Sequence, residues 1–233
     1  MSDLSYIDRN VERIRREIEL AASRAGRDPR EIRLLAAIKY TTPEQVGRLA
    51  ACGVTLVGEN RVQQFLEHRE DPGLDAFEVH FIGKLQCNKA KYVVGRVGLI
   101  ESLDSLKLAG ELDRCSEKAG VVTDVLCEIN SGREENKSGV MPEQASEFCA
   151  ALADFRSLRL RGFMTMAPVC EKKADYRKYF EETYRTALDI WEKTLHNIGK
   201  PLLSMGMSDS FAEAIAEGAD IVRVGRALFA EER

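Results

Sequence analysis

Eight apolar segments alternate with helix-forming segments along the 233-residue chain, and this alternation limits the possible folds more than any other feature. An unbroken apolar segment predicts a strand buried on both faces, whereas apolar residues three or four positions apart predict a helix. The segments that we predict as strands are 34–39, 55–57, 79–82, 98–101, 121–129, 158–164, 202–204 and 221–224.

Helices are predicted between these strands, and one more precedes the first strand. Pro43 and Pro142 stand at first helical turns, Ser105 caps a helix, and Ser208 or Asp209 caps another near the end of the chain. The predicted helices are 4–25, 43–51, a segment through 62–66, 86–94, 106–119, 142–154, 175–197 and 208–217.

This order of elements predicts an α/β fold, namely a single (β/α)₈ barrel of the TIM type with an extra N-terminal helix. A doubly wound open sheet is the alternative, but it usually has fewer strands, and no GxGxxG motif follows the first strand here. No linker, charge block or low-complexity segment interrupts the chain, so we predict one domain over residues 1–233.

The composition argues against several classes of partner. The net charge is −4 with no basic tract, so we do not expect a nucleic-acid partner. No apolar stretch approaches the ~20 residues that span a bilayer, and the charged N-terminal segment does not resemble a signal peptide. The six cysteines form no CxxC pair and the three histidines have no metal-ligand spacing. We therefore expect a cytoplasmic protein with reduced thiols, no metal site and no membrane contact.

Lys39 ends the first predicted strand, where a core element opens into a loop. Burial there would favour the neutral, nucleophilic amine, which could form a Schiff base with an aldehyde such as pyridoxal 5'-phosphate (PLP). Taken alone, however, a strand-end lysine more often extends its charged end into water.

The loops after the last two strands contain residues suited to an anion, and these loops form the common phosphate site of such barrels. They supply the hydroxyls of Ser204 and Ser208 and the small residues Gly206 and Gly225. Glycine lets an anion approach the backbone, and amides at a helix start near 208 would donate to it. Singly, Ser208 reads as a helix cap and Gly225 as a turn residue, but together they predict a phosphate site.

Arg223 interrupts the apolar strand 221–224 and therefore needs an acceptor. A structural salt bridge would serve, and so would the pyridine nitrogen of a cofactor whose phosphate lies on Gly225. Lys39, the phosphate loops and Arg223 together fit one ligand with an aldehyde, a ring nitrogen and a phosphate.

Seven segments make the chain resemble the pyridoxal phosphate homeostasis protein family, whose members are related to the barrel domain of bacterial alanine racemase. They follow the family's order over nearly the whole chain: AIK at 37–39, GENRVQ at 58–63, HFIGKLQCNK at 80–89, KSG at 137–139, RGFMTM at 161–166, LSMGMS at 203–208 and VRVG at 222–225. Tyr40 and Ser210 depart from the usual family pattern, which has a small or polar residue and an aspartate at these places.

The resemblance implies a barrel like the alanine racemase N-terminal domain that carries PLP as a covalent aldimine on Lys39. It implies that Arg223 faces the pyridine nitrogen. The other implied cofactor-binding residues are Ser204, Ser208, Gly225 and the Arg226 amide at the phosphate, and Asn60 and Met207 along the cofactor. His80 lies in a family motif without an assigned contact. Lys137 is expected to be a solvated loop lysine, although the family motif makes it a candidate second acceptor of PLP.

The implied site favours storage over catalysis. An arginine at the pyridine nitrogen disfavours a protonated ring and weakens it as an electron sink, although racemases tolerate this. Two-base racemisation also needs an acid or base on the cofactor face opposite the lysine. The related racemase takes this group, a tyrosine, from an additional β-domain, whereas the present chain ends shortly after its eighth strand.

We therefore expect a non-catalytic PLP-binding protein that holds and releases the cofactor in vitamin B6 homeostasis. Two alternatives stay open: a small PLP-dependent amino-acid racemase, and a barrel without this cofactor that binds another phosphate ester. Apo PLP-dependent enzymes are candidate acceptors of the released cofactor. We expect a monomer, with a dimer as the alternative.

Overall fold

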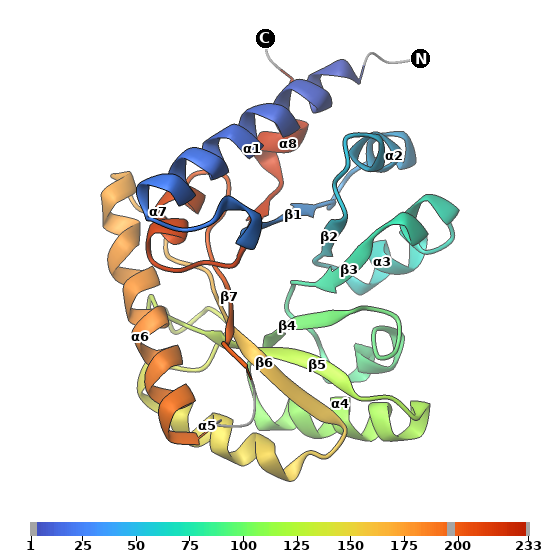
Figure 1. The fold of residues 1–233 in the computed structure, drawn as a ribbon. Helices are drawn as coiled ribbons and strands as arrows, with labels where there is room; N and C mark the ends of the chain where they lie inside the picture. The colour runs from blue at the N-terminus through green and yellow to red at the C-terminus, as the bar shows by residue number, and fades with distance from the viewer. Residues whose placement is uncertain (1–3, 195–198, 232–233) are drawn as a thin grey trace.

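Eight parallel strands close into a barrel in the computed structural model, which describes residues 4–194 and 199–231 (Figure 1). Each strand pairs with the next, and β1 also pairs with β8, where Leu35 stands beside Arg223. This closure confirms the predicted (β/α)₈ barrel and excludes the open sheet. The strands are β1 (Arg33–Ala37), β2 (Leu56–Glu59), β3 (Glu78–Phe81), β4 (Leu99–Leu103), β5 (Thr123–Ile129), β6 (Leu158–Thr165), β7 (Leu202–Ser204) and β8 (Ile221–Val224).

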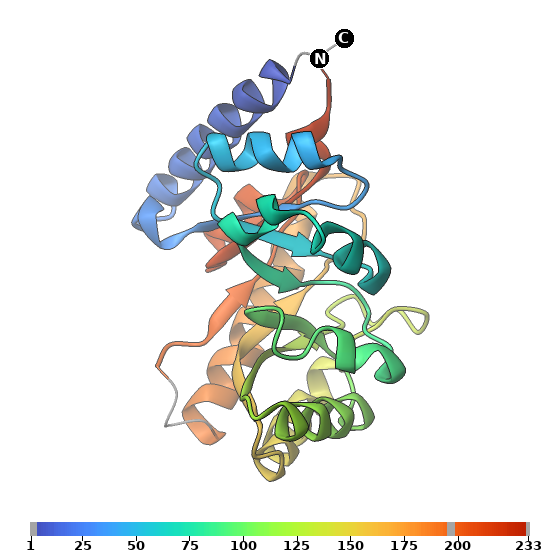
Figure 2. The same ribbon diagram turned by 90° about the vertical axis from the view of Figure 1, so that its right-hand side faces the viewer.

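Helices surround the barrel wall, and the extra N-terminal helix packs on two of the last ones (Figures 1 and 2). The α-helices are α1 (Ser5–Arg24), α2 (Pro43–Ala51), α3 (Val62–His68), α4 (Leu106–Ala119), α5 (Ala145–Ala151), α6 (Arg177–Thr194), α7 (Phe211–Ala216) and α8 (Arg226–Phe229). The apolar side of α1, with Ile7, Val11 and Ile14, is buried, and the helix lies against α7 and α8. No helix among the described residues is both long and apolar enough to cross a membrane.

Four helical segments differ from the sequence-based expectation. The segment expected at 86–94 is a 3-10 helix, Cys87–Tyr92, followed by β-branched Val93 and Val94, which are poor helix formers. The helix expected from 208 begins at Phe211 instead. Short 3-10 turns flank α5 and precede α6, and residues 195–197 of the expected helix lie outside the described residues. The sequence did not predict α8.

The barrel separates two apolar regions. The larger one lies between the strands and the helices and includes the fully buried rings of Phe65, Phe81 and Phe163. Inside the barrel are two small clusters, one of Leu35, Leu56, Ile221 and Ile82 and one of Leu99, Leu126, Met164 and Leu202. Because side chains alternate along a strand, Glu101 and Arg223 face the same interior as Leu99 and Ile221.

Candidate functional site

Lys39 lies in a tight turn two residues after the end of β1. The backbone amide and the hydroxyl of Thr41 donate to the carbonyl oxygen of Ile38 at 3.3 and 2.7 Å, and Tyr40 between them has a φ of 61°. Lys39 is exposed, and within the described part of the chain its amine has no hydrogen bond or ion pair. The strand expected to end at Lys39 ends at Ala37, and Lys39 is exposed, as the alternative of a strand-end lysine in water predicts. Its amine is available because the turn places it in solvent.

Asn60 follows β2 directly, and the backbone around it is packed so closely that two neighbouring positions, 58 and 83, have room only for glycine. A Cβ on Gly58 would lie 2.4 Å from Cδ2 of Leu35, and a Cβ on Gly83 would lie 2.0 Å from the carbonyl oxygen of Asn60. The loop after β3 therefore packs directly on the backbone of Asn60. The Oδ1 atom of Asn60 is buried and has no hydrogen-bond partner in the described structure. A buried amide oxygen without a partner marks a place where a polar ligand group would bind.

The loops that follow β7 and β8 contact each other. The backbone amide of Ala227 donates to Ser208 Oγ at 3.3 Å, and Asp209 forms an ion pair with Arg226. Ser208 therefore joins the two loops and does not cap α7, whose N-cap residue is Ser210. This hydrogen bond overturns the interpretation of Ser208 as a helix cap.

Gly225 brings the loop after β8 against β1. A Cβ on this glycine would lie 3.3 Å from both the Cβ and the carbonyl oxygen of Ala37. Lys39 follows Ala37 by two residues, so the expected phosphate loops lie beside the strand that leads to the expected aldehyde anchor. Met207, in the loop after β7, is 40% exposed.

Arg223 is buried in the barrel and finds its acceptors there. Its Nη1 donates to Ser204 Oγ at 2.7 Å, and its Nη2 donates to the carbonyl oxygen of Thr165 at 2.8 Å. Ser204 Oγ in turn donates to Oε2 of Glu101 at 2.6 Å. Because a hydroxyl has one proton, Ser204 cannot also donate to a phosphate in this arrangement. Its hydrogen bonds favour a role in holding Arg223 over the expected phosphate contact.

His80 connects Glu101 to Glu78 inside the barrel. Its Nδ1 is 2.7 Å from Glu101 Oε1, and its Nε2 is 2.7 Å from Glu78 Oε1. Burial opposes the positive charge on His80, but the hydrogen bonds to Glu101 and Glu78 outweigh it and raise the pKa of the imidazole. Burial likewise opposes the charge on Glu101, yet His80, Arg223 and Ser204 together lower the pKa of that carboxyl.

The sequence prediction missed Glu78 and Glu101 as partners of the site. A signal for Glu101 was present, because it stands two residues after Leu99 in a strand and therefore shares its face. Glu78 stands two residues before His80 in the same strand and likewise shares its face. The contact between His80 and Glu101 could not be found in the sequence, since it depends on which strands are neighbours.

Glu128, near the end of β5, is another buried carboxyl. It accepts a hydrogen bond from Ser138 Oγ at 2.8 Å, and burial raises its pKa. The adjacent Lys137 is exposed, and its amine is 3.7 Å from Glu134. Lys137 is thus a loop lysine in solvent, as the sequence predicted.

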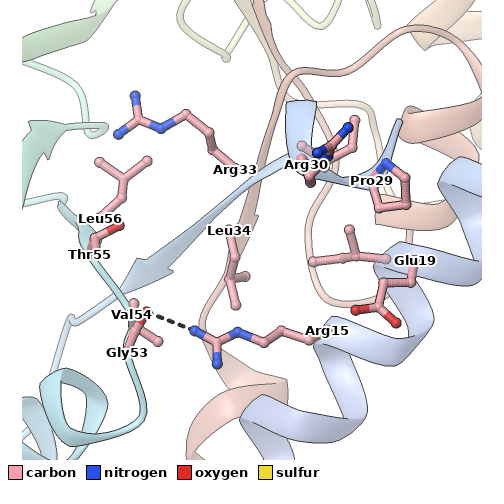
Figure 3. A pocket seen from close by; sticks show the side chains of 12 residues that line it. Arg15, Glu19, Pro29, Arg30, Arg33, Leu34, Gly53, Val54, Thr55 and Leu56 are labelled. Carbon is pink, nitrogen blue, oxygen red and sulfur yellow. Dashed lines mark hydrogen bonds between the residues drawn. The ribbon is translucent and has the colours of Figure 1, made fainter. Parts of the chain in front are cut away.

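The cavity drawn in Figure 3 lies at the other end of the barrel. Its lining comes from α1 and from the amino ends of β1 and β2, including Arg33 and Leu56. Arg15 of α1 donates to the backbone oxygens of Cys52 and Gly53 at 2.8 and 2.7 Å. None of the expected site residues lines this cavity, so we do not assign the cofactor to it.

The residues at the carboxyl ends of the strands fit a ligand with an aldehyde, a ring nitrogen and a phosphate. Lys39 supplies an amine, Asn60 an unpaired buried amide oxygen, and the joined loops at Ser208 and Gly225 a place for an anion. No group of three or more metal-ligating side chains occurs among the residues that the structure describes.

The chain is similar to proteins of known name over its whole length. The sequence model of the family described as "Alanine racemase, N-terminal domain" matches residues 3–232. The pyridoxal phosphate homeostasis protein of Aquifex aeolicus is 41% identical over 223 residues, covering 96% of this chain and 97% of that protein. The protein of the same name from Escherichia coli K12 is 34% identical, covering 98% and 97%. The solved structure of PipY from Synechococcus elongatus with PLP bound is 29% identical with a TM-score of 0.79, covering 92% of this chain and 100% of that one.

Proposed function

Because this chain belongs to the alanine racemase N-terminal domain family and, within it, to the pyridoxal phosphate homeostasis proteins, we propose that it binds PLP and holds and releases the cofactor without turning over a substrate. The observation that carries this proposal is the position of Lys39. Its amine is exposed and unpaired among the described residues, and Lys39 follows by two residues Ala37, against which Gly225 packs. The PLP bound to PipY supports the same ligand here.

In this proposal each residue contacts a different part of the cofactor. Lys39 forms the covalent link, and Arg223 faces the pyridine nitrogen from inside the barrel. Asn60 and Met207 line the cofactor. The phosphate lies on Ser208 and the backbone amides of Gly225 and Arg226, while Ser204 holds Arg223.

Bound PLP supplies an aldehyde that reacts reversibly with amines. The exposure of Lys39 allows an incoming amine or water to reach the link, which suits a protein that stores a cofactor and passes it on. We propose apo PLP-dependent enzymes as acceptors and a monomer of one barrel domain as the working form. The six free cysteines fit a reducing compartment, which we propose to be the cytoplasm.

Borohydride trapping tests this function directly. The protein is incubated with PLP, reduced and digested, and the modified lysine is located by mass spectrometry. We expect the adduct on Lys39, and we expect the loaded protein to restore activity to an apo PLP-dependent enzyme. The absence of a Lys39 adduct would contradict the proposal.

A small amino-acid racemase is the second candidate, because the matching family model is that of a racemase domain. Turnover of common L-amino acids by the pure, PLP-loaded protein, measured by chiral chromatography, separates the two candidates. Turnover that disappears in Lys39→Ala would establish the enzyme and remove the storage proposal.

A further inference from the structure

A line of hydrogen-bonded polar groups runs through the barrel from Arg33 on β1 to Arg223 on β8. Arg33 Nη2 is 2.5 Å from Glu78 Oε2, and Glu78 is followed by His80, Glu101 and Ser204 at contacts of 2.7, 2.7 and 2.6 Å. The last contact, from Arg223 Nη1 to Ser204 Oγ, is 2.7 Å. His80, Glu101 and Ser204 are each at most 1% exposed, so we call this line the interior polar chain.

The direction of each hydrogen bond at Ser204 is fixed. The guanidinium of Arg223 can only donate, so Ser204 Oγ accepts from it and gives its own proton to Glu101. Arg223 Nη1 is itself 4.0 Å from Glu101 Oε2. The carboxylate of Glu101 therefore orients the hydroxyl, and the hydroxyl orients the guanidinium.

His80 holds that carboxylate in place. A neutral imidazole has one donor nitrogen, whereas His80 has a carboxylate oxygen at both nitrogens, so both contacts are hydrogen bonds only in the imidazolium form. The charged groups that face His80 are Glu78 on its own strand and Glu101 on β4. Beyond them in the interior polar chain lie Arg33, which pairs with Glu78, and Arg223, which binds Ser204 beside Glu101. On β2, the residue beside His80 is Gly58, which has no charge.

Stability alone does not explain the interior polar chain. Buried ion pairs are often no more stabilising than apolar residues of the same volume, because desolvation offsets their attraction. The charges alternate in sign from Arg33 to Glu101, and the interior polar chain ends at Arg223, a buried cation two residues before Gly225 and the expected phosphate loop. This arrangement fits a set of hydrogen bonds whose role is to orient the guanidinium of Arg223.

We propose that His80 and Glu101 are positioning residues for the cofactor: the charged His80–Glu101 pair holds Arg223, through Ser204, in the orientation that faces the pyridine nitrogen. This inference rests on the proposed function. It predicts that the protonation of His80 changes the absorption spectrum and the retention of bound PLP.

The test uses the full-length chain loaded with PLP and compares His80→Gln and Glu101→Gln with the wild type. Glu101→Gln keeps the shape of the side chain and removes its charge, so it provides a second test if His80→Gln does not fold. Ser116→Ala is the control, because Ser116 is also buried and hydrogen-bonded, to Thr123 Oγ1 at 2.6 Å, but among the described residues it has no hydrogen bond to the interior polar chain or to the turn of Lys39. Borohydride trapping on Lys39 is checked first in every protein.

The measurements are the visible absorption band of the bound cofactor across a pH series and the rate at which an apo-enzyme removes it. We expect the absorption band of the wild type to change with pH, and we expect no such change in His80→Gln or Glu101→Gln. We expect release roughly tenfold faster in these variants, the effect of losing one charge-assisted hydrogen bond. In the cofactor-free protein, NMR titration of the His80 imidazole should show a pKa above its ordinary value, and Glu101→Gln should lower it.

The outcomes separate this inference from the function on which it rests. No Lys39 adduct in the wild type contradicts both. If the wild type forms the Lys39 adduct, and if the absorption band, its pH profile and the release rate are unchanged in His80→Gln and Glu101→Gln, only the positioning role is contradicted. The same changes in Ser116→Ala would also contradict it, because they would not depend on the interior polar chain that leads to Arg223.

Discussion

At the scale of single residues, the candidate site combines one unpaired amine with several fully paired charges. Lys39 is exposed and has no partner among the described residues, whereas Arg223 lies in a buried set of hydrogen bonds with Ser204 and Thr165. The first arrangement leaves a group free to react, and the second fixes a group in one orientation. Replacing Lys39 should therefore remove reactivity with little change in stability, whereas replacing a buried paired residue such as Arg223 should lower stability.

Lys39→Ala should abolish the borohydride-trapped PLP adduct while changing the free energy of unfolding by no more than about 0.5 kcal/mol, as is usual for an exposed side chain. Trapping with mass mapping and urea unfolding measure the two effects. Lys137→Ala is the matched control, since Lys137 is also an exposed loop lysine, and it should keep the adduct on Lys39. An adduct that survives in Lys39→Ala would show that another residue is the anchor.

His80 should make stability depend on pH. Its pKa in the folded chain is raised, so its ion pairs stabilise the fold fully below about pH 6.5, the ordinary imidazole value, and this contribution is lost as the pH rises through the folded pKa. The neighbouring Glu78 has its pKa lowered to about 2 by the hydrogen bond to His80. Its contribution is present above about pH 4.3 and is lost as the pH falls toward 2.

Urea unfolding of the wild type and of His80→Gln at a series of pH values measures this contribution. The difference in free energy of unfolding should be largest between about pH 5 and 6.5 and should shrink at alkaline pH. Lys137→Ala serves as the surface control and should show no such dependence. A difference that is constant with pH would contradict a charged His80 in the folded chain.

At the scale of elements, the sequence predicted regular segments well and their junctions less well. The strands 202–204 and 221–224 and the helices 43–51 and 106–119 have the predicted bounds, because apolar periodicity, Pro43 and Ser105 mark them locally. The helix expected from 208 begins at Phe211, and Ser208 instead accepts a hydrogen bond from the backbone amide of Ala227 in α8. The contacts of Glu101 with His80 and with Ser204 could not be predicted, since they join β4 to β3 and, across the barrel interior, to β7.

The loops after β2 and β3 pack closely only because glycines stand at the carboxyl ends of these strands. Gly83→Ala would place a Cβ 2.0 Å from the carbonyl oxygen of Asn60, so we expect a loss of about 1–3 kcal/mol in stability and weaker retention of PLP. Gly47→Ala is the control, because a Cβ there has no atom within 4 Å and alanine stabilises a helix interior by about 0.5–1 kcal/mol. Thermal unfolding and PLP release measure both, and equal stability of the two variants would contradict the close packing on Asn60.

At the scale of the whole molecule, the first helix holds the last segment of the barrel in place. Nδ2 of Asn10, on α1, donates to the carbonyl oxygens of Leu228 and Ala230 at 3.0 and 2.9 Å, and Asn10 is 4% exposed. Those carbonyls follow Gly225 and Arg226, the expected phosphate residues. The beginning and the end of the chain are thus joined beside the candidate site.

Asn10→Ala should destabilise the protein by about 1–3 kcal/mol, because two buried carbonyl oxygens lose their donor. In a chain of this size, this corresponds to a fall in Tm of roughly 2–4 °C per kcal/mol. PLP should also be released faster, since α8 carries the loop of Gly225. Arg9→Ala, on the exposed side of the same helix, is the control, and an equal effect of the two substitutions would contradict a specific role for Asn10.

The interior polar chain reaches solvent at the face of the barrel opposite Lys39. The side chain of Glu78 is 45% exposed, and its partner Arg33 lines the cavity of Figure 3. If PLP binds at Lys39, as we propose, the cofactor enters at one end of the barrel and the partly exposed Glu78 stands at the other. A molecule that fills the mouth beside Lys39 does not close the route by which His80 exchanges its proton with water. Under the proposed function, the PLP-bound protein would therefore still respond to pH at His80.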